Sequence, residues 1–100
     1  MKIRFSKLAQ VEYNEIIIYL FDAFGIEKAE KFELQFKNNI KQLKQFPYSF
    51  SRFFETDKRK FMVNPYITVV YTINEELEYI EILTFWFNRS DPQTLLKYLE

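Results

Sequence analysis

The stretch that decides the fold lies at residues 66–87, YITVVYTINEELEYIEILTFWF. Residues 66–73 are all β-branched or aromatic, which favours a strand. Residues 74–77, NEEL, form a polar turn between two apolar segments. Residues 78–87 carry apolar side chains on both faces, which is typical of a central strand that is covered on both sides. The stretch therefore predicts an antiparallel hairpin at the centre of the protein.

A further strand is predicted just before this hairpin. Residues 58–63, KRKFMV, are expected to form it, and Asn64-Pro65 is a turn signal. Residues 48–57 are expected to form a loop. Three consecutive strands joined by short turns predict an antiparallel meander.

The first half of the chain predicts a short strand and two helices. Residues 2–6 alternate polar and apolar side chains, as a strand does. Ser6 is a suitable N-cap for the first helix, and Gly25, the one glycine of the chain, suits a left-handed C-cap at its end. The expected core stripe of this helix consists of Leu8, Glu12, Ile16, Tyr19 and Ala23, with Val11 and Leu20 beside it.

The second helix is predicted over residues 27–45 and is stopped by Pro47. Glu33 and Lys37 are spaced for an exposed ion pair. The short link at Gly25 predicts that the two helices form an antiparallel hairpin. Its apolar stripe, which we assign to core packing, consists of Ala29, Phe32, Phe36, Ile40 and Leu43.

A third, short helix is predicted at the C-terminus. Asp91 and Pro92 form a helix-start signal, and the helix would run from Pro92 to Glu100. The helical hairpin is expected to cover one face of the sheet. The other face would be covered either by this tail or by another chain. The tail helix is too short to be stable alone, so its three leucines must dock on another surface.

Composition limits the chemistry that the chain can perform. The length of 100 residues predicts a single domain, residues 1–100, and the order of the predicted elements makes it α+β. The chain has no cysteine for a disulfide and no histidine as a proton shuttle. We expect neither a metal nor another cofactor. No membrane span or signal peptide is recognisable, and the expected location is the cytoplasm. The formal net charge is zero, so overall charge gives no argument for nucleic acid binding.

Basic residues nevertheless gather around two of the predicted strands. Lys58 and Lys60 would lie on one face of the strand at 58–63 and Arg59 on the other, while Arg52 precedes them in the loop. Arg89 follows the last strand. In a meander, Lys60 and Arg89 would lie near one another, with the middle strand between them. Such a group suits a phosphate backbone, stacked bases or an acidic peptide, and solvated surface lysines are the alternative.

Five segments follow one another in a recognisable order over about residues 2–92. They are SKLAQVEYNEIIIYL at 6–20, Ala29 with Phe32, LKQFP at 43–47, YITVVYTI at 66–73 and EILTFWFNRSDP at 81–92. With these segments, the order of the elements resembles the RelE/ParE superfamily of toxins from bacterial type II toxin–antitoxin modules. An LxxFP segment, a Tyr-rich strand and a strand that ends in Arg are characteristic of such toxins.

The resemblance implies a toxin that is held inactive by a cognate antitoxin, which would cover Trp86, Thr84 and Tyr66. The predicted action is ParE-like inhibition of DNA gyrase. One alternative is a RelE-like, ribosome-dependent mRNA interferase, which would be an endoribonuclease. A further alternative is an inactive interaction module with the same fold.

The resemblance also implies roles for the basic residues. Arg89, Lys60 and Lys58 would be the catalytic residues of a RelE-like enzyme, because phosphodiester cleavage requires proton transfer and charge stabilisation. Arg52, Arg59 and Arg89 would bind the target of a ParE-like toxin.

Overall fold

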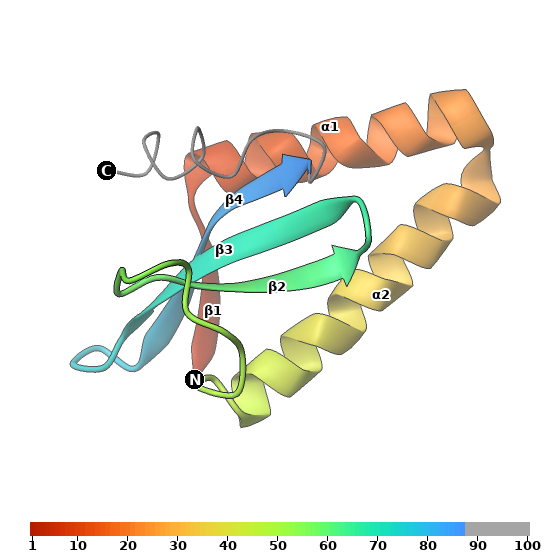
Figure 1. The fold of residues 1–100 in the computed structure, drawn as a ribbon. Helices are drawn as coiled ribbons and strands as arrows, with labels where there is room; N and C mark the ends of the chain where they lie inside the picture. The colour runs from red at the N-terminus through yellow and green to blue at the C-terminus, as the bar shows by residue number, and fades with distance from the viewer. Residues whose placement is uncertain (88–100) are drawn as a thin grey trace.

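The computed structural model describes residues 1–87, and these form two layers, a helical hairpin and a four-stranded sheet (Figure 1). The predicted α+β class, the helical hairpin on one face and the antiparallel meander are confirmed. The helix predicted at 92–100 lies outside the described residues. The elements are β1 (Lys2–Phe5), α1 (Lys7–Phe24), α2 (Ile26–Gln45), β2 (Arg59–Asn64), β3 (Ile67–Asn74) and β4 (Tyr79–Phe87).

The sheet has the strand order β1-β4-β3-β2. Its last three strands are antiparallel neighbours, whereas β1 pairs with β4 in parallel, from Lys2 opposite Tyr79 to Phe5 opposite Ile82. The first strand therefore forms one edge of the sheet, beside the first half of the last described strand. The pairing joins strands that are distant in sequence, and the helical hairpin lies between them along the chain.

Ser6 joins β1, α1 and β4 at one point. Its hydroxyl oxygen accepts a hydrogen bond from the Ala9 N–H at 3.0 Å, which confirms the predicted N-cap. The same hydroxyl donates to the Leu83 carbonyl at 2.8 Å, and the Ser6 N–H donates to the Ile82 carbonyl at 3.0 Å. The start of α1 is thereby fixed to the middle of β4.

Gly25 makes the sharp turn between the two helices. Its φ of 93° confirms the expected positive φ, but its ψ of 175° is extended rather than left-handed helical, so α2 begins at the next residue. An added Cβ would meet nothing within 4 Å, so the glycine is required by its backbone conformation rather than by space.

The core between the two layers is built around the ring of Phe36. Its centroid lies 5.3 Å from that of Phe85, 5.4 Å from that of Tyr13 and 5.9 Å from that of Phe5. These separations are typical of favourable aromatic packing. The predicted stripe of α2 is confirmed, since Ile40 packs on this core and the other members, Ala29, Phe32, Phe36 and Leu43, are buried.

The predicted stripe of α1 is wrong in part, because the helix is rotated about its axis. Leu8, Val11 and Tyr19 are exposed, whereas Ala9 and Ile16 are buried against the sheet. The hydrogen bonds of Ser6 and Glu12 to β4 fix this rotation, and they turn Ala9 rather than Leu8 toward the sheet. No helix within residues 1–87 combines the length and apolarity needed to cross a membrane.

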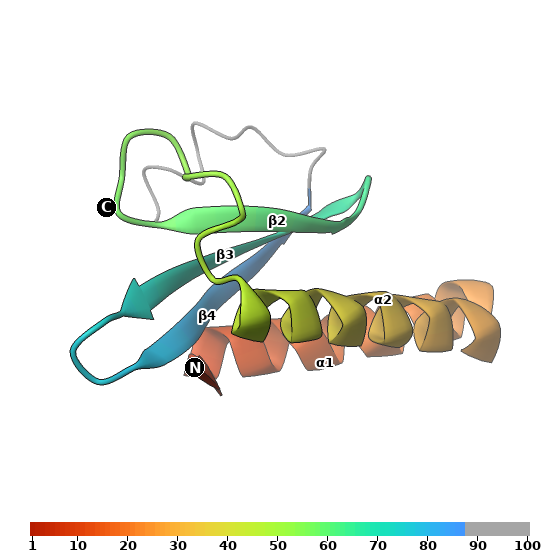
Figure 2. The same cartoon turned by 90° about the horizontal axis from the view of Figure 1, so that it is seen from below.

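The face of the sheet opposite the helices is partly covered by the chain's own loop. The segment between α2 and β2 crosses to that face, as Figure 2 shows. There Phe53 is buried and packs with Val70, Leu83 and Trp86. The expectation that only the C-terminal tail or another chain covers this face is therefore wrong, because an aromatic side chain in a predicted loop supplies part of the cover.

The Glu12 side chain accepts hydrogen bonds from β4 beyond the end of β1. Among residues 1–87, no strand continues β1 past Phe5, although β4 runs on to Phe87. The Glu12 carboxylate takes the place of a strand there, since one oxygen accepts the Thr84 hydroxyl at 2.7 Å and the Phe85 N–H at 3.1 Å. This carboxylate therefore anchors the middle of α1 to the sheet.

Replacing Glu12 by Ala should lower the free energy of unfolding by about 1–3 kcal/mol, because the Phe85 N–H and the Thr84 hydroxyl would lose their acceptor. Glu12→Gln keeps an acceptor oxygen and should cost less. Urea unfolding followed by circular dichroism measures both variants. Equal losses for Ala and Gln would contradict the acceptor role.

The difference in stability between the natural protein and Glu12→Gln should depend on pH. Burial is the main cause that raises the pKa of Glu12 above its ordinary value of 4.5, so the folded state holds this proton more tightly than the unfolded state. The resulting stabilisation is present below about pH 4.5 and is lost as the pH rises through the folded pKa. The stability of the natural protein relative to Glu12→Gln should therefore increase from pH 7 to pH 4.

Candidate functional site

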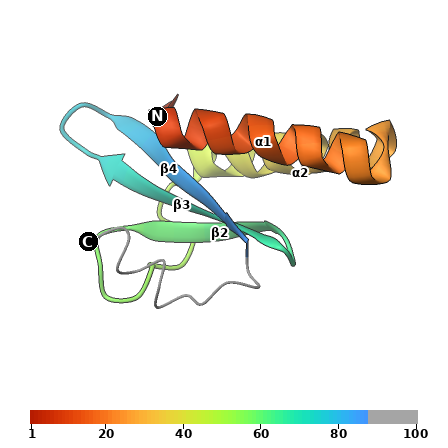
Figure 3. The ribbon, with the colours of Figure 1, turned by 90° about the horizontal axis from the view of Figure 1, so that it is seen from above.

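A groove of about 880 Å³ lies between the two helices and the ends of β3 and β4. Ile16, Phe32 and Phe85 lie at its base, where the helices meet the sheet. The tip of the helical hairpin, where α1 meets α2, extends past the sheet, as Figure 3 shows from above. Residues of the core therefore close the groove at its base.

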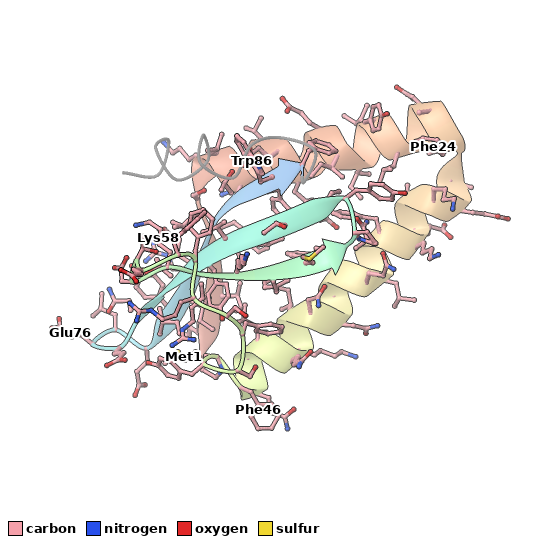
Figure 4. All side chains as sticks on the ribbon, in the orientation of Figure 1. Met1, Phe24, Phe46, Lys58, Glu76 and Trp86 are labelled. Carbon is pink, nitrogen blue, oxygen red and sulfur yellow. The ribbon has the colours of Figure 1, made fainter. Side chains whose placement is uncertain are left out.

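Aromatic side chains form the rim of this groove. Tyr19 and Phe24 come from the end of α1, and Tyr66 comes from the turn between β2 and β3. All three are exposed. Phe24 stands at the hairpin tip, while Trp86 lies in β4 (Figure 4). Large exposed aromatic side chains around an apolar hollow are typical of a surface that binds another protein.

The two helical walls of the groove carry opposite charges. Glu12 and Glu15 line it from α1, and Lys28 and Lys31 line it from α2. The pKa of Glu12 is raised mainly by burial and also by the nearby Glu15, while its hydrogen bonds act in the opposite direction. An apolar segment with basic groups on one side and acidic groups on the other would match both walls.

The three residues predicted to contact an antitoxin do not share one surface. Tyr66 lines the groove, and Trp86 borders it at the end of β4 while its side chain also packs on the Phe53 cluster of the opposite face. Thr84 is only 1% exposed and donates its hydroxyl to Glu12, so its side chain offers no contact surface. The indole Nε1 of Trp86 is buried and has no hydrogen-bond acceptor among residues 1–87.

The predicted basic residues are divided between the two faces of β2. Lys60 is exposed and stands opposite Val70 on the face away from the helices, while its neighbour Phe61 is buried in the core under them. Arg59 stands opposite Tyr71, which belongs to that same core, so Lys60 and Arg59 lie on opposite faces as predicted.

Two of the predicted basic residues bind the chain itself. The Arg59 guanidinium donates to the Phe50 carbonyl at 2.7 Å and to the Tyr48 carbonyl at 3.3 Å. Arg52 donates twice to the Thr56 carbonyl, at 3.1 and 2.9 Å. These contacts hold the segment between α2 and β2 in place. A sequence pattern could not find them, because backbone carbonyls leave no signature in a sequence.

Lys58 and Arg89 complete the predicted set. The Lys58 ammonium lies 3.4 Å from the Asp57 carboxylate, at the start of β2. In Figure 4, Lys58 lies at the end of the molecule opposite Phe24 and thus far from the groove rim. Arg89 lies outside the described residues, so its proximity to Lys60 stays a prediction.

Two tyrosines near the basic residues have raised pKa values, and both hold the loop. The hydrogen bond from Tyr48 to Glu75 is the main cause that raises the pKa of Tyr48. Burial raises the pKa of Tyr71 to about 12, and its hydroxyl donates to the Pro47 carbonyl at 2.8 Å. Both side chains therefore stay protonated near neutral pH. Within residues 1–87, no group of three or more acidic side chains is placed to hold a metal ion.

The arrangement of these elements is found in two solved structures of toxin–antitoxin proteins. The structure superposes on a chain of the chromosomal ParDE TA system from P. aeruginosa with a TM-score of 0.69, over 85% of this chain and 92% of that one, at 19% identity. It matches the YoeB/ParE toxin from Agrobacterium tumefaciens with a TM-score of 0.64, over 88% of this chain and 99% of that one, at 11% identity. No protein-family model and no curated protein matches the sequence. The chain therefore has the fold of these ParDE and YoeB/ParE structures.

Replacing Arg59 by Ala should destabilise the protein by about 1–3 kcal/mol, because two backbone carbonyls lose a charged donor. Lys60→Ala is the matched control on the next residue and should change stability by less than about 0.5 kcal/mol. Urea unfolding gives the size of the effect, and amide hydrogen exchange should locate the loosening in residues 46–53. A stable Arg59→Ala protein with an unchanged loop would contradict this role.

Proposed function

We propose that this protein is the toxin of a type II toxin–antitoxin module and that a cognate antitoxin neutralises it. The observation that carries the proposal is the fold, which matches two toxin-type structures over nearly their whole lengths. The groove supports it further, since an apolar hollow with an aromatic rim suits a partner chain. Trp86 and Tyr66 are the proposed contact residues there.

The proposed target is DNA gyrase, in the manner of ParE. The support is the state of the arginines, because Arg52 and Arg59 already hold backbone carbonyls and serve the loop. Because these two arginines hold the loop, we expect the protein to bind its target through the shape of this surface and through the charges that remain on it. Lys60 and Arg89 are the residues that we propose to contact the target.

The second candidate is a RelE-like mRNA interferase. The exposed position of Lys60 favours it, because a lysine on an open sheet face can reach a phosphodiester. In this case Lys58, Lys60 and Arg89 would stabilise the charge that develops at phosphorus. The two candidates differ in the molecule that is damaged.

Expression of the chain without its antitoxin should arrest growth, and Lys60→Ala with Arg89→Ala should relieve the arrest. Lys44→Ala removes a charge from the last turn of α2 and is the control that should stay toxic. Loss of gyrase supercoiling with intact messenger RNA supports the ParE-like action. Codon-phased cuts in ribosome-bound messenger RNA would replace that action by the RelE-like one, and normal growth of every strain would contradict both.

The adjacent gene product should co-purify with the chain if it is the antitoxin. Tyr66→Ala should weaken this complex by about tenfold or more, because Tyr66 is 74% exposed on the groove rim and its loss leaves the core intact. Leu77→Ala is the matched control, since Leu77 is 70% exposed in the turn between β3 and β4. Calorimetric titration measures both variants, and equal effects would place the antitoxin elsewhere.

A further inference from the structure

The solvent face of α1 is apolar, whereas that of α2 is charged. Val11, Ile18 and Phe21 are all exposed on α1. They follow one another at helical spacing, with Asn14 completing the series at intervals of three, four and three residues. A single exposed apolar residue is ordinary, but a series along one helix face is typical of a helix that packs on another.

Comparison with α2 shows that this face is not required by the fold. Both helices cover the same side of the sheet, and both have one face in solvent. Leu34 is an exposed large apolar residue of α2, and its neighbours on that face are charged. They include Glu27, Glu30, Lys37 and Lys41.

The charges at the two ends of α1 are opposite to what its own dipole favours. Lys7 lies in the first turn, which has no acidic residue, and Asp22 lies in the last turn, which has no basic residue. A helix is stabilised by acids at its N-terminus and bases at its C-terminus. Both charges of α1 are therefore unfavourable within one chain.

We propose that α1 is the interface for a second copy of this chain, packed antiparallel across a two-fold axis at the level of Ile16. Such packing places Val11 opposite Phe21 of the second copy and Asn14 opposite Ile18. It also brings each Lys7 to the C-terminal end of the other α1, beside Asp22, where both charges become favourable. The same series thus faces itself when reversed, and the charges at its two ends become complementary.

Gly25 leaves room for this approach. The two-fold arrangement places Lys7 of one copy above Gly25 of the other, where nothing beyond the glycine and its two chain neighbours lies within 4 Å of an added Cβ position. The contact is one helix face of 18 residues, or roughly 27 Å at 1.5 Å per residue. An interface of this size is small, so the dimer should form reversibly and dissociate on dilution.

Sedimentation of the full chain over roughly 5–500 µM tests the proposal. The natural protein should pass from monomer to dimer across this range, and Ile18→Lys should stay monomeric. Leu34→Lys is the matched control on α2, because Leu34 is 61% exposed and Ile18 is 60% exposed. It should dimerise like the natural protein. A natural protein that stays monomeric throughout, or two variants that behave alike, overturns the proposal.

The direction of packing can be tested separately, because the chain contains no cysteine. A mixture of Val11→Cys and Phe21→Cys proteins should form a disulfide between the two variants under mild oxidation. Val11→Cys alone should not cross-link, and its cross-linking to itself would overturn the antiparallel arrangement. If Ile18→Lys instead abolishes binding of the adjacent gene product and leaves the dimer unchanged, the face belongs to that partner and the proposal fails. None of these results depends on toxicity.

Discussion

The end of β1 at Phe5, well before β4 ends, is the constraint on which the rest of the structure depends. A parallel neighbour covers only the first half of β4, and the backbone of the second half must find other partners. The chain meets this need with side chains that follow β1 directly. The Ser6 hydroxyl donates to the Leu83 carbonyl, and the Glu12 carboxylate accepts the Phe85 N–H. Helix α1 is therefore held at its start and middle by the strand edge that it protects.

The groove is a consequence of the same constraint. Because α1 is fixed to β4 near its N-terminal half, its C-terminal half continues past the sheet together with the start of α2 (Figures 1 and 3). The side chains there cannot pack on strands. Tyr19 and Phe24 stay exposed, and the space between them and Trp86 is left open. The apolar hollow thus arises where the helical layer is longer than the sheet layer.

Local patterns in the sequence predict the elements well. The stripe of α2, the N-cap at Ser6, the turn at Gly25 and the three strands of the meander all follow from spacing and turn chemistry. The rotation of α1 does not, because it depends on the hydrogen bonds that Ser6 and Glu12 make to β4. The exposed apolar residues of α1 blur its periodicity further, so that Leu8 and Val11 are indistinguishable from core residues in the sequence.

The candidate site is less predictable, since it depends on contacts across the fold. Sequence places Trp86, Tyr66 and the basic residues near the meander, and two of these line the groove. It cannot show that Arg59 is occupied by the carbonyls of Phe50 and Tyr48. Nor can it show that Thr84 is buried behind Glu12. One signal was available, because a carboxylate at position 12 in an otherwise apolar stripe needs a buried partner.

Helix α1 presents different surfaces on two sides, so two partners could bind the helix at the same time. Ile16 and Leu20 face the groove, whereas Val11, Ile18 and Phe21 lie on the solvent side of the same helix. A partner segment in the groove would contact the inner wall of α1 and leave the outer face accessible. Two copies joined through their outer faces would therefore each keep an open groove. Binding of a segment in the groove therefore does not require release of a chain from the outer face of α1.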